Sequence, residues 1–196
     1  MAEGIVDDVW RGWRDPRGAM AREVAAGLSE ARSLLHLMLA CGLLFVASLP
    51  NALREARGLD IADPVEGAIA AHLFGYLALA PLLVYGLAAL VHLAARGFGA
   101  RGGFRAARAA LFWSLLLAAP LAIGLALLGA AVEILAPGGL PLLDWLGYAA
   151  LGFWLWVFAA SLAEAEGFGA TRRVAAVVAA ALGAVAGLVG LLAGGA

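Results

Sequence analysis

The sequence has little charge, no lysine and one cysteine. Only 14% of its 196 residues are charged and 64% are hydrophobic, whereas soluble domains average about 25% charged and about 45–50% apolar residues. This composition excludes a soluble enzyme and a disordered tail protein. The single cysteine, Cys41, excludes an intrachain disulfide and with it a disulfide scaffold. All 13 basic residues are arginine, which together with abundant Ala and Gly is typical of a GC-rich bacterial genome.

Charge is absent from five long apolar runs. At about 1.5 Å rise per residue, about 20 helical residues cross a bilayer core of roughly 30 Å. The runs match that length and lack the alternation of a membrane β-strand, so they predict an all-α integral membrane protein with five transmembrane helices. The spans are expected at 33–53, 67–95, 109–132, 145–163 and 174–194, within one membrane domain of residues 33–196.

The arginines predict the orientation of these spans. With a cytoplasmic N-terminus, eleven arginines face the cytoplasm and only Arg54 and Arg57 face the other side. Cytoplasmic loops are enriched in arginine and lysine, so we expect the N-terminus inside, the C-terminus outside, and insertion in the cytoplasmic (inner) membrane of a bacterium. The formal net charge of −1 gives no attraction to nucleic acid, which is not expected as a partner.

Residues 1–32 predict a cytoplasmic amphipathic arm before the first span. They hold eleven charges and no apolar segment of a signal peptide. Trp10 and Trp13 lie on an apolar stripe at helical spacing and suit the lipid headgroup zone. Asp15 followed by Pro16 predicts a helix start. The arm is interpreted either as a membrane-lying anchor or as a docking segment for a protein partner.

Prolines mark three of the spans. Span one is expected to end near Pro50, and Pro81 and Pro120 lie near the midpoints of spans two and three. A proline removes one backbone donor and frees a carbonyl that must find another partner in lipid. We therefore expect helix kinks at Pro81 and Pro120, either packed inside the bundle or forming the ligand site of a small transporter or channel.

Small residues and a repeated tetrapeptide stand out elsewhere. Gly183 and Gly187 form a GxxxG face that predicts close helix packing, inside the bundle or between two copies, which leaves the oligomeric state open. Residues 97–100 and 167–170 both read Gly-Phe-Gly-Ala and are followed by arginines, which suggests two similar hairpins. Residues 97–102 also fit G-x-G-x-x-G, but this loop follows no strand, so dinucleotide binding is rejected.

Arginines around these loops are candidates for contact with an anionic lipid headgroup, a phosphate or a partner, because helix N-termini and guanidinium groups both favour anions. The alternative is that they only fix topology. The candidate residues are Arg96, Arg101, Arg105, Arg108, Arg172 and Arg173.

No Asp, Glu or Arg lies inside the runs, but three histidines do. By depth, His36 and His92 could approach each other and Glu164 or Glu166, whereas His72 could meet Glu133 or Asp144. Their spacing resembles no metal-ligand motif. No nucleophile lies beside a base in the sequence pattern. We therefore expect no enzymatic activity, no metal and no cofactor.

The order of these features resembles a known family. An acidic and aromatic arm precedes five spans, a Gly-rich loop runs into Phe104, and the third span is proline-kinked. The fourth span ends in Trp-Val-Phe-Ala-Ala-Ser-Leu-Ala-Glu-Ala-Glu-Gly-Phe at 156–168. This pattern resembles the bacterial branch of the Yip domain family, whose eukaryotic members bind Rab-type GTPases through a cytosolic N-terminal region.

The resemblance implies a non-enzymatic membrane protein with a membrane-organising, scaffold or trafficking-like role. The eukaryotic Asp-Leu-Tyr-Gly-Pro motif is missing and the arm is short, so the resemblance does not extend to Rab binding. Membrane lipids are the expected partners, together with a protein that meets the arm. The alternative function is a small transporter or channel that uses Pro81 and Pro120.

Overall fold

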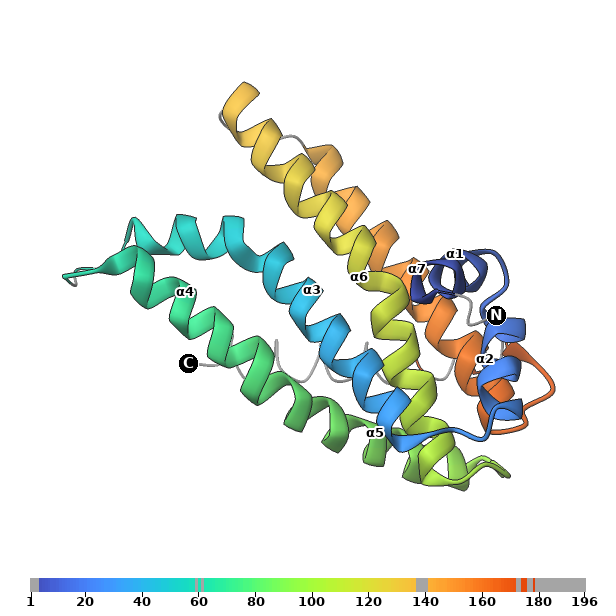
Figure 1. Cartoon of the computed structure of the whole chain (residues 1–196). Coiled ribbons are helices and arrows are strands. Elements are labelled where there is room, and N and C mark those ends of the chain that lie inside the picture. Colours follow the sequence, from blue (N-terminus) through green and yellow to red (C-terminus); the bar gives the residue numbers. More distant parts are fainter. Residues whose placement is uncertain are drawn as a thin grey trace, which may run out of the picture.

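The computed structural model of the chain describes residues 4–58, 60, 62–136, 141–171, 174, 175 and 178. These residues form helices and short connections without a strand, as predicted (Figure 1). The elements are α1 (Ile5–Arg14), α2 (Pro16–Ala25), α3 (Glu30–Ala56), α4 (Pro64–Phe74), the π-helical turn η1 (Gly75–Leu79), α5 (Ala80–Gly97), α6 (Phe104–Leu135) and α7 (Pro141–Ala165).

Four segments of the described chain are long and apolar enough to cross a membrane. They are Glu30–Ala56, Pro64–Gly97, Phe104–Leu135 and Leu142–Ala165, and they correspond to the first four predicted spans. The fifth predicted span, 174–194, lies outside the described residues except for 174, 175 and 178. Gly183 and Gly187 are among the residues that are not described.

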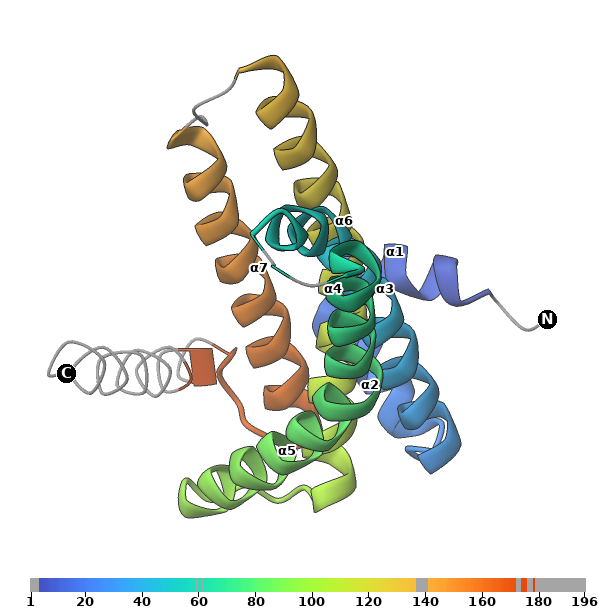
Figure 2. The ribbon, with the colours of Figure 1, turned by 90° about the vertical axis from the view of Figure 1, so that its left-hand side faces the viewer.

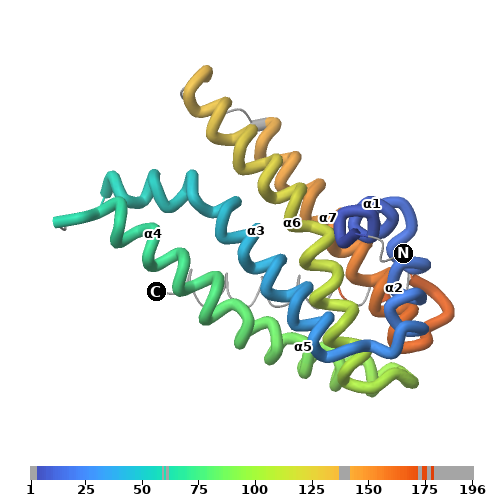
Figure 3. Tube along the Cα trace, viewed as in Figure 1, coloured from blue at the N-terminus to red at the C-terminus, as the bar shows by residue number. Residues whose placement is uncertain are grey.

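Helix α6 is the centre of the bundle, in contact with α3, α5 and α7. The hairpin of α3 with α4–α5 and the hairpin of α6 with α7 meet at one end and diverge at the other (Figures 1 and 2). The N-terminal helices α1 and α2 lie where the hairpins meet (Figure 3). We call this region the packed end; it includes α1, α2 and the loops 98–103 and 166–170.

The core is concentrated at the packed end. Phe112, Trp113 and Leu117 of α6 are at most 2% exposed, and Met20 of α2 packs into the same cluster with no exposed surface. Burial of one such side chain contributes about 1.5–3 kcal/mol. Toward the opposite end α6 exposes apolar side chains such as Ile134, which suits a helix surrounded by lipid. Protein packing therefore holds the packed end, and the other end presents an apolar surface.

Pro50 lies inside α3, which continues to Ala56, so the expected end of span one at Pro50 is wrong. A proline removes one N–H and crowds the carbonyl four residues earlier, which bends a helix without always ending it. The Ser48 hydroxyl donates a 2.7 Å hydrogen bond to the Phe45 carbonyl in this turn. Figure 1 shows α3 bending in this part of the chain.

The other two prolines lie within continuous helical segments. Pro81 is in the first turn of α5, directly after η1, where the Ala80 N–H donates to the Gly75 carbonyl five residues earlier. Such a wide turn absorbs a local irregularity in a helix without ending it. Pro120 lies in the middle of α6.

Candidate functional site

Helix α1 packs across α6 close to Pro120. Trp13 Nε1 donates a 2.7 Å hydrogen bond to the Leu117 carbonyl, three residues before Pro120, in the turn that a proline ring distorts. Gly12 permits this approach because a Cβ atom there would lie only 2.7 Å from Leu117 Cδ2. A glycine and a tryptophan thus fix α1 on the bundle.

Helix α2 is fixed to the end of α7 by an ion pair. Asp15 accepts a 2.9 Å hydrogen bond from the Gly18 N–H, so Asp15 and Pro16 start α2 as predicted. From the first turn of this helix, Arg17 Nε reaches Glu164 Oε2 at 2.6 Å. The sequence separation of 147 residues means that the arm joins the two ends of the described chain.

The arm is therefore part of the bundle, which the sequence pattern did not indicate. Trp13 is partly buried on α6, where its N–H donates to a carbonyl of the protein; its place at the depth of the lipid headgroups stays a prediction. Trp10 and Val6 face outward and are 54% and 76% exposed. Only this outer face of α1 remains available to lipid or to a partner.

The two Gly-Phe-Gly-Ala segments end α5 and α7, but in different registers. At the end of α5 the left-handed residue is Gly99, with Ala100 N–H bonded to the Ala95 carbonyl. At the end of α7 the left-handed residue is Gly167, with Phe168 N–H bonded to the Ala163 carbonyl. Both are Schellman caps, which place a glycine directly after the helix. Because the second glycine is used in one loop and the first in the other, the tetrapeptide does not mark two equivalent hairpins.

The two loops contact each other at Gly102. The Arg101 N–H donates a 2.9 Å hydrogen bond to the Glu166 carbonyl, and a Cβ on Gly102 would lie 2.5 Å from the Ala165 carbonyl oxygen. This glycine therefore allows close contact between two backbones. The loop connects α5 to α6, so its G-x-G-x-x-G spacing lies outside the strand-turn-helix context of a dinucleotide site.

The arginines of the Gly-rich loop divide into two sets. Arg96, Arg101 and Arg105 are exposed. In contrast, Arg108 is 6% exposed, pairs with Glu30 and lies over the Tyr85 and Phe104 rings, each 5.4 Å from the guanidinium carbon. Arg108 thus joins α3, α5 and α6 and does not present its charge to the surface. Arg172 and Arg173 lie outside the described residues.

His36 and His92 occupy separate places, so their expected approach is wrong. His92 Nδ1 lies 3.2 Å from Glu166 Oε1, a partner that its depth had indicated. Glu166 has no exposed surface, and its Oε2 has no hydrogen-bond partner among the described residues. His36 packs against Trp113, with ring centroids 5.0 Å apart.

His72 also has other partners than expected. Its ring nitrogens lie 3.0 Å from Ser48 Oγ and 3.1 Å from Glu55 Oε2, whereas Glu133 pairs with Arg54 at 3.6 Å. Both of its contacts are with α3, because α4 packs along that helix. Within the described ranges no three His, Cys, Asp or Glu residues form a group able to hold a metal ion.

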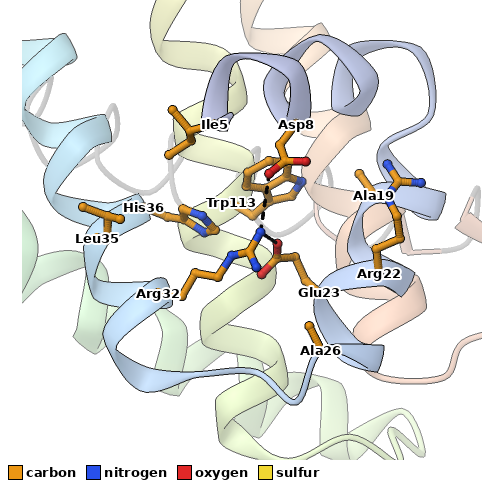
Figure 4. A pocket seen from close by; sticks show the side chains of 10 residues that line it. All are labelled: Ile5, Asp8, Ala19, Arg22, Glu23, Ala26, Arg32, Leu35, His36 and Trp113. Atoms are coloured by element: carbon orange, nitrogen blue, oxygen red, sulfur yellow. Dashed lines mark hydrogen bonds and ion pairs between the residues drawn. The ribbon is translucent and has the colours of Figure 1, made fainter. Parts of the chain in front are cut away.

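A cavity of about 500 Å³ lies at the packed end, between the arm and the helices α3 and α6 (Figure 4). Arg32 projects from α3 and forms ion pairs with Asp8 at 3.4 Å and Glu23 at 2.8 Å (Figure 4). The full lining consists of Ile5, Asp8, Ala19, Arg22, Glu23, Ala26, Arg32, Leu35, His36 and Trp113. Neither Pro81 nor Pro120 belongs to it.

Burial and the neighbouring arginines act in opposite directions on the Glu23 carboxylate in this cavity. Burial raises the pKa of Glu23 above its ordinary value, and the Asp8 carboxylate adds to the rise, whereas the guanidinium groups of Arg32 and, more weakly, Arg22 oppose it. The carboxylate thus lies at a site where its charged form is poorly solvated and is stabilised mainly by Arg32.

A family model for the Yip1 domain matches residues 12–194 of the chain. The chain belongs to the Yip1 domain family. No curated protein and no solved structure matches it. As a member of this family it is a Yip-like integral membrane protein, which agrees with the apolar helices of the described chain.

The Yip1 match begins at Gly12, so it includes α2, both loops and the cavity walls from α2, α3 and α6. Sequence reasoning on this Yip1 domain missed Arg32, Glu23 and Trp113 as parts of one site. The signal in the sequence was weak: Arg32 is the last charge before a span, and Glu23 is one of six acids in the arm. Their meeting depends on how the arm folds back.

Proposed function

We propose that this Yip1 domain protein is a non-enzymatic organiser of the bacterial cytoplasmic membrane. In this proposal it has five spans, a cytoplasmic arm and an outside C-terminus. Its packed end faces the inner leaflet and binds anionic lipid headgroups. The observation that carries the proposal is the division of the arginines. Arg96 at the end of α5, Arg101 on the loop and Arg105 at the start of α6 remain exposed, while Arg108 is used inside the bundle.

The geometry of the loop supports lipid binding. Gly102 and the Arg101 N–H hold the loop against the end of α7, so three cations stand on a fixed support beside the N-terminus of α6. Each basic residue near an anionic leaflet contributes about 1 kcal/mol of attraction. Among the described residues none of the three arginines forms an ion pair that would compete with a lipid phosphate.

Lipid retention tests this function directly. The full chain, purified in detergent, is titrated with phosphatidylglycerol and bound lipid is counted by native mass spectrometry. The triple variant Arg96→Gln, Arg101→Gln, Arg105→Gln should lose at least about tenfold in affinity, since tenfold corresponds to about 1.4 kcal/mol. Arg57→Gln, an exposed arginine at the opposite end of the described bundle, is the matched control. Unchanged affinity in the triple variant would refute the proposal.

A protein partner, if the arm binds one, would meet the outer face of α1, because its inner face covers α6. Removing the whole arm would uncover the cluster around Met20 and disturb the bundle. Trp10→Ser is the sharper change, since Trp10 is 54% exposed. We expect this variant to lose crosslinks to a partner in native membranes while its melting temperature stays unchanged. Equal crosslinking would assign the arm to lipid alone.

A reporter fused after Ala196 tests the proposed topology. A reporter found in the cytoplasm would contradict the proposal that the C-terminus lies outside.

A further inference from the structure

The cavity at the packed end carries both signs of charge in equal number. Asp8 and Glu23 supply two carboxylates, and Arg22 and Arg32 supply two guanidinium groups. Arg32 stands between the two acids, while Arg22 reaches the same space from α2 without an ion pair among the described residues (Figure 4). A phosphate at Arg22 and Arg32 would compete with the two acids for the Arg32 guanidinium group. A small group that also bears an ammonium would give the acids a cation in return.

The inner wall of the cavity offers an unused donor. Trp113 is 2% exposed, lines the cavity, and its indole Nε1 is buried without a hydrogen-bond partner among the described residues. Figure 4 shows the ring at the back of the cavity, with His36 on one side. A buried N–H without a partner is unfavourable, so an acceptor at this place would be stabilised.

An apolar strip leads from the cavity along the membrane-spanning part of α3. Leu35 lines the cavity and is 51% exposed. Leu39 and Val46 follow on the same face of the helix and are 37% and 48% exposed. A molecule whose polar end fills the cavity and whose apolar chains follow this strip would be amphipathic, which identifies it as a membrane lipid and not as a soluble metabolite.

We propose that this cavity binds the headgroup of a phospholipid that carries a primary amine, of the phosphatidylethanolamine class. The phosphate would lie at Arg22 and Arg32 and accept from the Trp113 indole N–H, and the ammonium group would lie at Asp8 and Glu23. The inference rests on the proposed function only in placing the packed end at the level of the lipid headgroups. It concerns a different site and a different lipid.

The chemistry of the lining discriminates among lipids. Phosphatidylglycerol has the phosphate but no cation for the two carboxylates. Phosphatidylcholine has the cation, but its quaternary nitrogen has no N–H donors, and charge-assisted hydrogen bonds are the stronger kind. Only the primary amine gives the carboxylates donors while the phosphate meets the arginines. The cavity should therefore prefer ethanolamine over choline headgroups.

The experiment titrates the purified full chain in detergent with dioleoyl phosphatidylethanolamine or dioleoyl phosphatidylcholine, with native mass spectrometry counting bound lipid. The wild-type chain should bind the ethanolamine lipid about tenfold more tightly, and Arg22→Gln should weaken it by about tenfold, the effect of one charge-assisted contact. Arg57→Gln is the control for loss of an exposed arginine. Equal binding of the two lipids by the wild type, or full binding by Arg22→Gln, would overturn the proposal.

A second variant gives a gain that misfolding cannot produce. Asp8→Asn combined with Glu23→Gln removes both negative charges, so the cavity should lose its preference for the amine and bind phosphatidylglycerol more tightly than the wild type does. No gain of phosphatidylglycerol binding would count against the assigned orientation. The triple variant at Arg96, Arg101 and Arg105 separates the two proposals, because it should lose phosphatidylglycerol and keep the ethanolamine preference.

Discussion

The close contact between Gly12 and Leu117 allows the packing of the arm on α6 to be tested by one substitution, Gly12→Ala. A methyl group on Gly12 would lie 2.7 Å from Leu117 Cδ2 and 3.2 Å from Trp113 Cζ2, whereas carbon atoms prefer about 3.5–4.0 Å. The two helices must then separate by about 0.8 Å, because Leu117 is fully buried and cannot turn away. Overpacking of this kind costs about 1–3 kcal/mol.

The separation would also stretch the hydrogen bond from Trp13 to the Leu117 carbonyl, which contributes about 1 kcal/mol net. Against this, alanine favours the helical state of α1 by about 0.5–1 kcal/mol over glycine. The balance for Gly12→Ala is a docking weakened by about 1–2 kcal/mol. The undocked arm should then become about 5–30 times more populated.

Limited trypsin digestion of the purified full chain measures the fraction of molecules in which the arm is undocked. Arg11, Arg14 and Arg17 lie in the arm, and cleavage of a transiently opened segment follows the population of its open form when opening is fast. The matched control is Gly86→Ala in α5, where a Cβ would meet no atom within 4 Å. Gly12→Ala should be cut faster and Gly86→Ala at the wild-type rate. Equal or slower cutting of Gly12→Ala would refute the view that close approach holds the arm.

Three further substitutions test other contacts. Gly102→Ala should lower the stability by about 1–3 kcal/mol, because its Cβ would lie 2.5 Å from a backbone carbonyl oxygen. Gly97→Ala is the control, since a Cβ there meets open space, and it should melt like the wild type. Equal melting temperatures of the two variants would contradict this prediction. Arg108→Met should destabilise the bundle by about 1–3 kcal/mol through loss of its ion pair and ring contacts, in a thermal melt in which the exposed Arg96→Met stays near wild type. Because burial raises the pKa of Glu23, its contribution to stability is complete below about pH 4.5 and is lost as pH rises through its value in the folded protein. The difference in melting temperature between wild type and Glu23→Gln should therefore fall as pH rises, and a constant difference would contradict the pKa argument.

The sequence predicts the parts of this fold that lipid dictates. Length and the absence of charge locate the four long apolar helical segments to within a few residues, because an uncharged apolar helix of that length has few alternatives in a bilayer. Local capping is equally readable: Asp15 and Pro16 start α2 as expected. These features depend on neighbouring residues only, and so they can be derived without knowing how the helices pack.

Tertiary contacts account for the errors. Pro50 looks like a stop, yet α3 continues because its flanking turns are held by other helices. The repeated tetrapeptide looks like one structure twice, yet the end of each helix selects a different glycine, Gly99 or Gly167, for the left-handed position. His72 finds Ser48 and Glu55 of α3, a choice set by which helices are neighbours. None of these outcomes is encoded within a window of one helix.

The arginines show why charge position alone underdetermines a site. Positive residues near one end of the spans fix orientation, and that requirement is met whether a side chain points outward or inward. Arg17, Arg32 and Arg108 use their charge to tie the arm and three helices together, whereas Arg96 and Arg105 leave theirs at the surface. The same residue type, in segments that read alike, thus supplies both the ties that shape the packed end and the charges that remain for a ligand. At the exposed loop, a substitution that tests binding must therefore be taken from the second set, because a change in the first set also alters packing.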